Sequence, residues 1–372
     1  MQTPGVPAGP AQAASKQNHW LKVLKPDFDD ALKHWRAFWA GEVLDRPVIS
    51  VVAPRDGTPE LQGQIYTEGH DGNFDEPIQR ATAWIESRFW GGDAIPRYVP
   101  SFGPDMFAGF LGARLEYAPD TGTSWAVPFV EKWQDVLPLR LDEHNAVWTR
   151  LQAFMRRMTE AAQGRWIVSH IDMHSNMDAV SAIRNPERLC MDLLDTPELV
   201  ERAMADVRRL FPLITDRLYQ ATDQAVMGSS GWIPMYSEKR YNVTQCDFCC
   251  MVSQPMFRRF ILPALADETE HLDCSVYHLD GPGALRHLDD LLALPKLNAI
   301  QWVPGAGNKP LREWMDLLRK IIAAGKSVHV YCDIKEIEHF HKALGPKGVF
   351  YDCGAPSEAA ARRAVEWLRK NT

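Results

Sequence analysis

The chain has 372 residues, of which 45% are hydrophobic and 24% are charged. This length and composition exclude a small disulfide-rich protein and a disordered one, and allow roughly two domains or one large α/β barrel. The 41 Lys and Arg against 48 Asp and Glu give a net charge of −7, which provides no electrostatic reason to expect binding to nucleic acid or an anionic membrane. We therefore expect a small-molecule partner.

The hydropathy and the cysteines bear on the cellular compartment. No apolar run approaches the roughly 20 residues that span a bilayer, and the N-terminal residues lack the apolar segment of a secretion signal. The seven cysteines are odd in number and mostly widely spaced, which favours reduced thiols over a disulfide framework. These features predict a cytoplasmic protein.

The N-terminal part divides into a leader and a helix. Residues 1–18 are rich in Pro, Ala, Gly and Gln, which predicts a disordered leader before a folded domain over residues 19–372. Trp35 and Trp39 then belong to an apolar pattern with helical spacing, which predicts an amphipathic helix over residues 29–41. A Trp stripe of this kind is typical of a packed core.

Short β-branched or aromatic runs follow, and helical patterns separate most of them. This alternation is what a parallel sheet requires. Eight such runs predict a single (β/α)8 barrel, with a doubly wound open sheet as the alternative. The long segment 103–165 is expected to form an insertion over the barrel mouth. The predicted strands cover residues 48–54, 95–102, 166–174, 223–231, 274–280, 297–303, 327–333 and 349–353.

Polar side chains stand at the carboxyl ends of several predicted strands, where the active sites of (β/α)8 barrels form. Because each polar group buried without a partner costs about 1–3 kcal/mol, we expect them to share one site. The strand at 166–174 ends with three of them at alternate positions, and hence on one face. The strand-end residues are His170, Asp172, His174, Tyr277, His278, Asp280, Gln301, Trp302, Cys332, Asp333, Asp352 and Cys353.

Several of these positions also have a purely structural interpretation. A single His such as His170 or His174 is more often a hydrogen-bonded structural residue, and a single Cys is more often a small buried hydrophobe. His278 and Asp280 make the stronger case, because a His-x-Asp directly before a Gly-Pro-Gly turn places two types of metal ligand on one face.

The segment QCDFCCMVS contains a further acidic residue and three cysteines. Cys246, Cys249 and Cys250 include a C-x-x-C spacing, but no second pair completes a zinc-finger pattern, so packing is the favoured interpretation. Asp247 lies just before a predicted helix start at Ser253, which makes it a candidate for contact with substrate.

Four segments resemble the uroporphyrinogen decarboxylase superfamily, which also contains corrinoid-linked methyltransferases and, more distantly, cobalamin-independent methionine synthase. Their order and spacing extend over nearly all of the chain after residue 30, and SQPMFRRFILP is the most specific match. The resemblance implies a (β/α)8 barrel, in agreement with the strand count. The segments are DRPVISVVAPR (45–55), CDFCCMVSQPMFRRFILPAL (246–265), YHLDGPG (277–283) and GVFYDCGAPSEAAARRAVEWLRKN (348–371).

The resemblance also implies a metal site. The methyltransferases of this superfamily hold zinc with a His-x-Cys strand and a Cys near the last strand. Here His278 matches the His, Asp280 replaces the first Cys, and Cys353 lies near the position of the last. These three residues are therefore the implied ligands, with zinc as the expected ion and manganese or iron as alternatives.

We accordingly expect a zinc-dependent methyltransferase or demethylase component that moves a methyl group between a small substrate or thiol and a corrinoid. The corrinoid would be carried by a separate protein, since the chain contains no evident corrinoid-binding domain. The residues expected to act as catalytic groups that bind or protonate the substrate are Asp247, His170 and His174. Those expected to line the substrate site are Arg55, Asp172, Tyr277, Gln301 and Trp302.

Two alternatives remain. The decarboxylases of the superfamily carry an Arg-rich segment after the first strand, where this chain offers only Arg55, so uroporphyrinogen with its eight carboxylates is a doubtful substrate. A metal-free decarboxylase would use Arg55 to bind a smaller carboxylate and Asp247 or Asp280 as general acid. The other alternative is a non-catalytic barrel that binds a small ligand or a protein partner.

Overall fold

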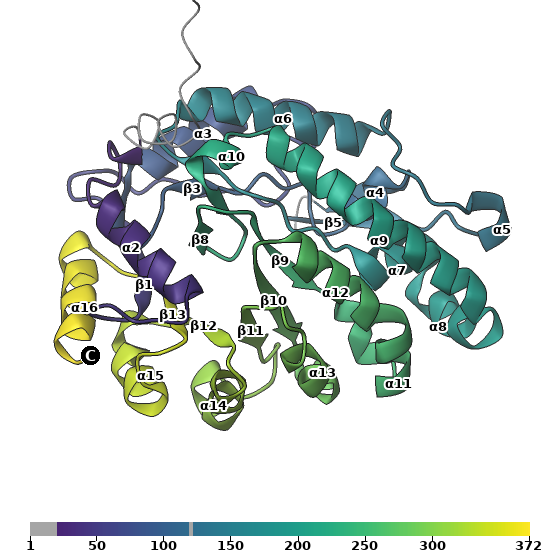
Figure 1. Ribbon diagram of the computed structural model, residues 1–372. Helices are drawn as coiled ribbons and strands as arrows, with labels where there is room; N and C mark the ends of the chain where they lie inside the picture. The colour runs from purple at the N-terminus through teal and green to yellow at the C-terminus, as the bar shows by residue number, and fades with distance from the viewer. Residues whose placement is uncertain (1–20, 119–121) are drawn as a thin grey trace, which may run out of the picture.

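A mostly parallel sheet lies at the centre of the computed structural model, which describes residues 21–118 and 122–372, and helices surround it (Figure 1). The leader expected over residues 1–18 lies outside the described residues. All neighbouring strands of this seven-stranded sheet are parallel except the first pair. Across the sheet, the order is β2 (Arg88–Gly92), β1 (Val48–Pro54), β13 (Val349–Gly354), β12 (Ser327–Tyr331), β11 (Ala299–Val303), β10 (Cys274–Asp280) and β9 (Tyr241–Gln245).

Three two-stranded pairs accompany the central sheet. They are β3 (Arg97–Tyr98) with β6 (Ile167–Val168), β4 (Arg114–Ala118) with β5 (Thr123–Val127), and β7 (Ser229–Ser230) with β8 (Tyr236–Ser237). Among the described residues, the strand hydrogen bonds leave the central sheet open at β2 and β9 instead of closing it into a ring. The structure therefore confirms the mostly parallel α/β architecture that the sequence predicted. The strand hydrogen bonds of the described residues do not show an eight-stranded closed barrel.

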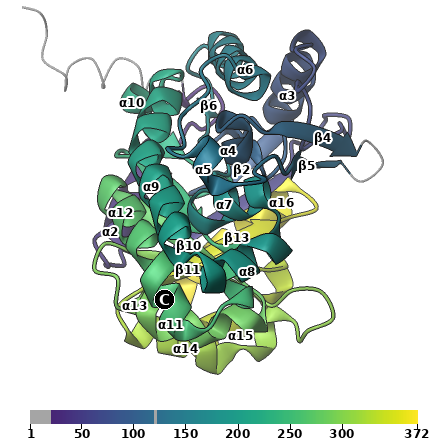
Figure 2. The same ribbon diagram turned by 90° about the vertical axis from the view of Figure 1, so that its right-hand side faces the viewer.

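The helices pack around the strands in both views (Figures 1 and 2). The segment predicted as an insertion contains α4, the β4–β5 hairpin, α5 and α6, and the hairpin packs against α4 and α7. No helix in the described part of the chain is long and apolar enough to cross a membrane. The helices are α2 (Phe28–Trp39), α3 (Asp75–Glu86), α4 (Met106–Phe110), α5 (Trp133–Val136), α6 (Ala146–Ala162), α7 (Asn176–Arg184), α8 (Pro186–Asp195), α9 (Pro197–Gln220), α10 (Gln224–Met227), α11 (Gln254–Met256), α12 (Leu262–His271), α13 (Leu288–Leu292), α14 (Met315–Ala323), α15 (Ile337–Leu344) and α16 (Glu358–Lys370).

The fourth predicted strand is wrong in most of its length. Residues 223–231 contain the short helix α10 and only the two residues of β7, which pairs with β8 outside the central sheet. The central sheet instead uses β9, which the sequence analysis missed. Every residue of β9 is buried, and β9 pairs in parallel with β10.

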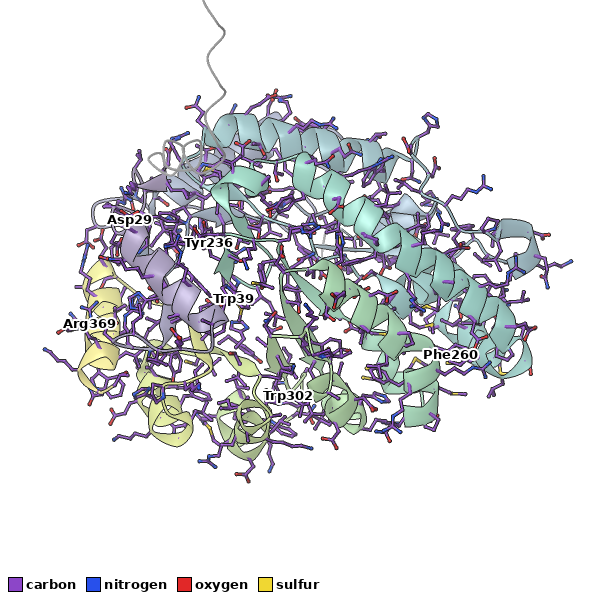
Figure 3. The ribbon with its side chains drawn as sticks, in the orientation of Figure 1. Asp29, Trp39, Tyr236, Phe260, Trp302 and Arg369 are labelled. Atoms are coloured by element: carbon purple, nitrogen blue, oxygen red, sulfur yellow. The ribbon has the colours of Figure 1, made fainter. Side chains whose placement is uncertain are left out.

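The amino-terminal ends of the strands enclose a buried apolar core that α2 covers. Trp35 of α2, Val48 of β1, Ile167 of β6 and Val276 of β10 all belong to this core. Helix α2 matches its prediction closely, and Trp39 donates a hydrogen bond from Nε1 to the Tyr236 carbonyl at 2.7 Å (Figure 3). Since Ile167 shares this core, β6 faces the same interior as the central sheet.

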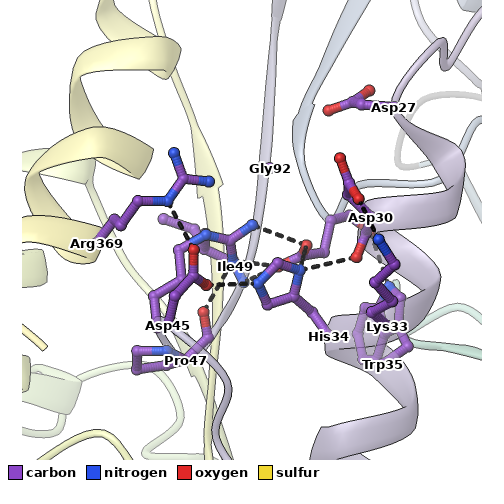
Figure 4. Close-up of polar contacts among 12 residues, drawn as sticks. Asp27, Asp30, Lys33, His34, Trp35, Asp45, Pro47, Ile49, Gly92 and Arg369 are labelled. Carbon is purple, nitrogen blue, oxygen red and sulfur yellow. Dashed lines mark hydrogen bonds and ion pairs between the residues drawn. The ribbon is translucent and has the colours of Figure 1, made fainter.

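A buried ion network ties α2 to the start of β1 (Figure 4). Arg46 donates two hydrogen bonds to Asp93, at 2.5 and 2.9 Å, and His34 Nδ1 lies 3.1 Å from the same carboxylate. Burial raises the pKa of Asp93, but Arg46 and then His34 outweigh this effect and lower the pKa to about 2. The carboxylate is therefore ionised and fully paired at neutral pH.

Candidate metal centre

Three side chains of the kinds that bind metal lie close together at the carboxyl end of the central sheet: Asp247, His278 and Asp280. One ligand atom of each lies within 4.8 Å of those of the other two. His278 and Asp280 are two residues apart on β10, so they point to the same face. Asp247 begins the 3-10 helix η1 (Asp247–Met251), which follows β9, the parallel neighbour of β10. We call these three residues the triad.

Asp178, on α7, holds Asp247 in position. Its carboxylate accepts hydrogen bonds from the backbone N–H groups of Asp247 and Phe248, each at 2.9 Å. Burial raises the pKa of Asp178 to about 6, and the nearby Asp247 charge acts in the same direction. The sequence offered no signal for this contact, because α7 and η1 are far apart along the chain.

The segment after β6 is held in a strained conformation beside the triad. His174 has a φ of 37° and Asn176 a φ of 48°, which are left-handed conformations that cost about 1–2 kcal/mol in residues other than glycine. The Asn176 amide compensates by donating a hydrogen bond to the Gln245 carbonyl at 2.7 Å. This bond links the segment to the end of β9, immediately before η1.

The surroundings of the triad are acidic. Asp172 Oδ2 lies 3.3 Å from His174 Nε2. Burial lowers the pKa of His174, but Asp172, Asp178 and Asp247 outweigh this effect and raise the pKa to about 10, so the ring is protonated at neutral pH. Burial raises the pKa of Asp247, and Asp280 and Asp172 raise it further against the opposing effect of the two imidazoles. A bound cation would offset this concentration of carboxylates.

A chain of hydrogen bonds starts at His278 of the triad and links four neighbouring strands, β10, β11, β12 and β13. His278 Nδ1 lies 2.5 Å from Gln301 Oε1, and Gln301 Nε2 lies 2.9 Å from His329 Nδ1. His329 Nε2 lies 3.2 Å from Asp352 Oδ2. His278 and Gln301 are register partners in the sheet, as are Gln301 and His329.

This chain fixes the tautomer of His278 when His329 is neutral. A carboxylate only accepts hydrogen bonds, so Asp352 requires a proton on His329 Nε2, and His329 Nδ1 must accept from the Gln301 amide nitrogen. The Gln301 oxygen then accepts from His278 Nδ1–H. His278 Nε2 is left with a free lone pair, which is the form in which imidazole binds metal.

The donors of the triad fit a divalent metal ion. Imidazole nitrogen and carboxylate oxygen are both donors that zinc accepts, and three protein ligands leave the fourth position of a catalytic site open for water or substrate. A hydrogen-bond acceptor behind the ligating imidazole, here Gln301, is the usual companion of such a site. Oxygen donors also suit manganese and iron.

A cavity of about 750 Å³ lies at the Asp352 end of this hydrogen-bond chain, and none of the three triad residues is among the described residues that line it. Trp232 lines it and also packs edge-on against the His278 ring, with centroids 5.1 Å apart. Arg97, which the sequence analysis missed, lines it and donates hydrogen bonds to the Gly231 and Trp232 carbonyls. Asp352 lines it as well, so the hydrogen-bond chain connects the cavity wall to the triad.

Two of the residues expected to bind substrate lie on the opposite face of their strands. Tyr277 is next to His278 and Trp302 is next to Gln301, so each points away from the triad. Tyr277 is 1% exposed and Trp302 is fully buried, and both pack in the core between the sheet and the helices. Trp302, labelled in Figure 3, contacts Trp314 edge-to-face beside α14. Neither Tyr277 nor Trp302 is among the described residues that line the cavity.

Cys353 also lies apart from His278 and Asp280. Its strand, β13, is separated from β10 by β12 and β11, and Cys353 lines the cavity beside Asp352. Asp352, one residue earlier, points to the inner face and reaches His329. The structure therefore does not bring Cys353 together with His278 and Asp280; the ligand atom that lies within 4.8 Å of theirs belongs to Asp247.

His170 and Arg55 occupy positions outside the cavity. His170 is 1% exposed and lies against Asn242, 2.9 Å from its side-chain nitrogen. Burial lowers the pKa of His170 to about 4, so its ring is neutral at physiological pH. Arg55 follows β1 and donates to the Arg88 carbonyl at 3.4 Å. By contrast, Asp172, His174 and Gln301 lie beside the triad or in contact with it.

The comparisons with known proteins concern the fold. No family model matches the chain, and no curated protein matches it. Among solved structures, a methyltransferase from Methanosarcina mazei aligns with a TM-score of 0.59, over 92% of this chain and 98% of that one. The two proteins share a fold. Their sequences are 11% identical, so the likeness carries no further than the fold.

Proposed function

We propose that this protein is a metal-dependent methyltransferase in which Asp247, His278 and Asp280 hold the ion. The observation that carries the proposal is that one imidazole and two carboxylates have ligand atoms within 4.8 Å of one another, with the Gln301 side chain behind the His278 ring. The sequence resemblance to corrinoid-linked methyltransferases supports the reaction class. So does the fold shared with a protein described as a methyltransferase.

We further propose that the scaffold is an α/β barrel of the uroporphyrinogen decarboxylase superfamily. In this interpretation β3 and β6 would fill the gap between the open edges of the central sheet at β2 and β9. The core that Ile167 of β6 shares with Val48 and Val276 supports it. In barrels of this kind the reacting groups stand at the carboxyl ends of the strands, which is where the triad lies.

A divalent ion bound by the triad would lower the pKa of an incoming thiol and supply a thiolate nucleophile at neutral pH. The protein's own groups do the rest. Gln301 keeps the His278 lone pair directed away from β11, and Asp178 keeps Asp247 at the start of η1. His174, protonated beside Asp172, is a donor for an anionic group of the substrate.

The proposed reaction is the transfer of a methyl group between sulfur and a corrinoid carried by a separate protein. The new carbon–sulfur bond forms as the carbon–cobalt bond breaks, and the cobalt keeps the electron pair of the broken bond. Cobalt is thereby reduced from the trivalent to the monovalent state, and the thiol proton passes to solvent. The reverse direction would demethylate a small thioether.

The test uses metal-stripped protein reloaded with zinc, methylcobalamin as donor and a panel of small thiols as acceptors. We expect the absorbance of methylcobalamin to fall with the zinc-loaded protein. Reaction should be lost with chelator and in His278→Ala, and retained in Cys353→Ser. The same rate in the zinc-loaded, chelated and His278→Ala proteins, or none with any thiol, would contradict the proposal.

A further inference from the structure

Cys332 and Cys353 place two thiols side by side at the wall of the cavity. Their sulfur atoms are 3.7 Å apart. Tyr331 of β12 is the register partner of Asp352 of β13, so the two cysteines are the next pair along these neighbouring strands. The Cys332 N–H donates to the Asp352 carbonyl at 3.1 Å, which holds the pair at the strand ends. Neither cysteine belongs to the triad.

The backbone geometry suits a bond between the two sulfur atoms. Neighbouring strands lie about 4.8 Å apart, and disulfides join Cα atoms separated by roughly 4.4–6.8 Å. Because the cysteines occupy paired positions, their side chains leave the sheet on the same face. The sulfur separation of 3.7 Å needs to fall to about 2.05 Å, which side-chain rotation can supply without moving the strands far.

We propose that Cys332 and Cys353 are a redox modification site that forms a reversible disulfide with a peroxide as oxidant. Both cysteines line the cavity, but Cys332 is half-buried whereas Cys353 is 4% exposed, so Cys332 meets the peroxide first. Two other cysteines donate to oxygen atoms instead: Cys246 to the Asp178 carboxylate, and Cys250 to the Asp280 carbonyl.

The reaction balances with one peroxide molecule. The Cys332 sulfur attacks one peroxide oxygen, the oxygen–oxygen bond breaks, and a sulfenic acid and one water form. The Cys353 sulfur then attacks the Cys332 sulfur, the sulfur–oxygen bond breaks, and a second water leaves. The two thiols lose two electrons and two protons in total, and the peroxide is reduced to water.

The sequence allows a direct assignment of the bond. Trypsin releases Cys332 in the peptide 327–335 and Cys353 in the peptide 348–362, and each peptide contains a single cysteine. The full chain is treated with hydrogen peroxide, its remaining thiols are alkylated, and the digest is analysed by mass spectrometry. We expect the two peptides to appear as one linked species, lighter than their sum by two hydrogen atoms, and dithiothreitol to separate them.

Three variants sharpen this test. Cys353→Ser should stop at the sulfenic acid, which dimedone traps on Cys332, and Cys332→Ser should give no adduct on Cys353. Cys190→Ser, a control on α8 outside the cavity lining, should leave the linked species unchanged. Recovery of both wild-type peptides as separately alkylated species after peroxide, or linkage of either one to another cysteine, would overturn the proposal. Since no readout uses metal or methyl transfer, its failure is distinguishable from failure of the proposed function.

Discussion

Replacing Gln301 tests whether the hydrogen-bond chain prepares His278 for metal. Gln301→Met keeps an unbranched side chain of similar length but removes the bonds to His278 at 2.5 Å and His329 at 2.9 Å. His278 then loses the acceptor that fixes its tautomer. Removing such a partner typically lowers metal affinity about 10- to 100-fold, which corresponds to about 1.4–2.7 kcal/mol of binding free energy.

The assay is a zinc titration of metal-free protein in competition with a chromophoric chelator at neutral pH. Gln301→Glu is the matched control, because its carboxylate still accepts from His278 Nδ1–H and should preserve the affinity of the wild type. A thermal unfolding curve shows whether each variant is folded. Wild-type zinc affinity in a folded Gln301→Met variant would refute the reasoning.

The remaining predictions concern the ion network, the buried Trp302 side chain and the role of Cys353 as a ligand. Asp93→Asn should lower the free energy of unfolding by about 3–5 kcal/mol in denaturant titrations, because it leaves Arg46 buried without its counter-charge. The lowered pKa of Asp93 stabilises the folded wild type above pH 3.8. About 2 kcal/mol of its unfolding free energy should therefore be lost as the pH falls from 3.8 through about 2. The same loss of unfolding free energy in Asp93→Asn would contradict this. Trp302→Ala should cost about 3–5 kcal/mol of unfolding free energy yet keep the zinc affinity of the wild type; loss of zinc binding in the folded variant would place Trp302 at the site. Cys353→Ser should also keep that affinity, and a large loss would restore the sulfur as a ligand.

The side of each strand was harder to predict than the strand itself. The sequence predicted the bounds of β1 and β10 correctly, because runs of β-branched and aromatic residues are local signals. The sequence could not show which of the two alternating sets of side chains in each strand faces the interior. Tyr277 and Trp302 were therefore expected at the cavity, although they are the outward neighbours of His278 and Gln301.

Contacts between distant segments account for the other differences. The strand β9 was not predicted from the sequence, and it is defined by its parallel pairing with β10. Asp247 was selected from the sequence, but not its place beside His278, which depends on Asp178 and on the course of η1. Arg97 gave no motif, because its role at the cavity arises from the Gly231 and Trp232 carbonyls. None of these contacts has a local signature.

The most direct measurement of the central claim is the zinc stoichiometry of metal-stripped protein compared with its His278→Ala variant. We predict that the wild type takes up a single tightly bound equivalent of zinc, and that the folded variant has lost it. Asp172→Asn, which changes a neighbouring carboxylate outside the triad, should still bind that equivalent. Equal zinc uptake by the wild type and the His278→Ala variant would contradict the account.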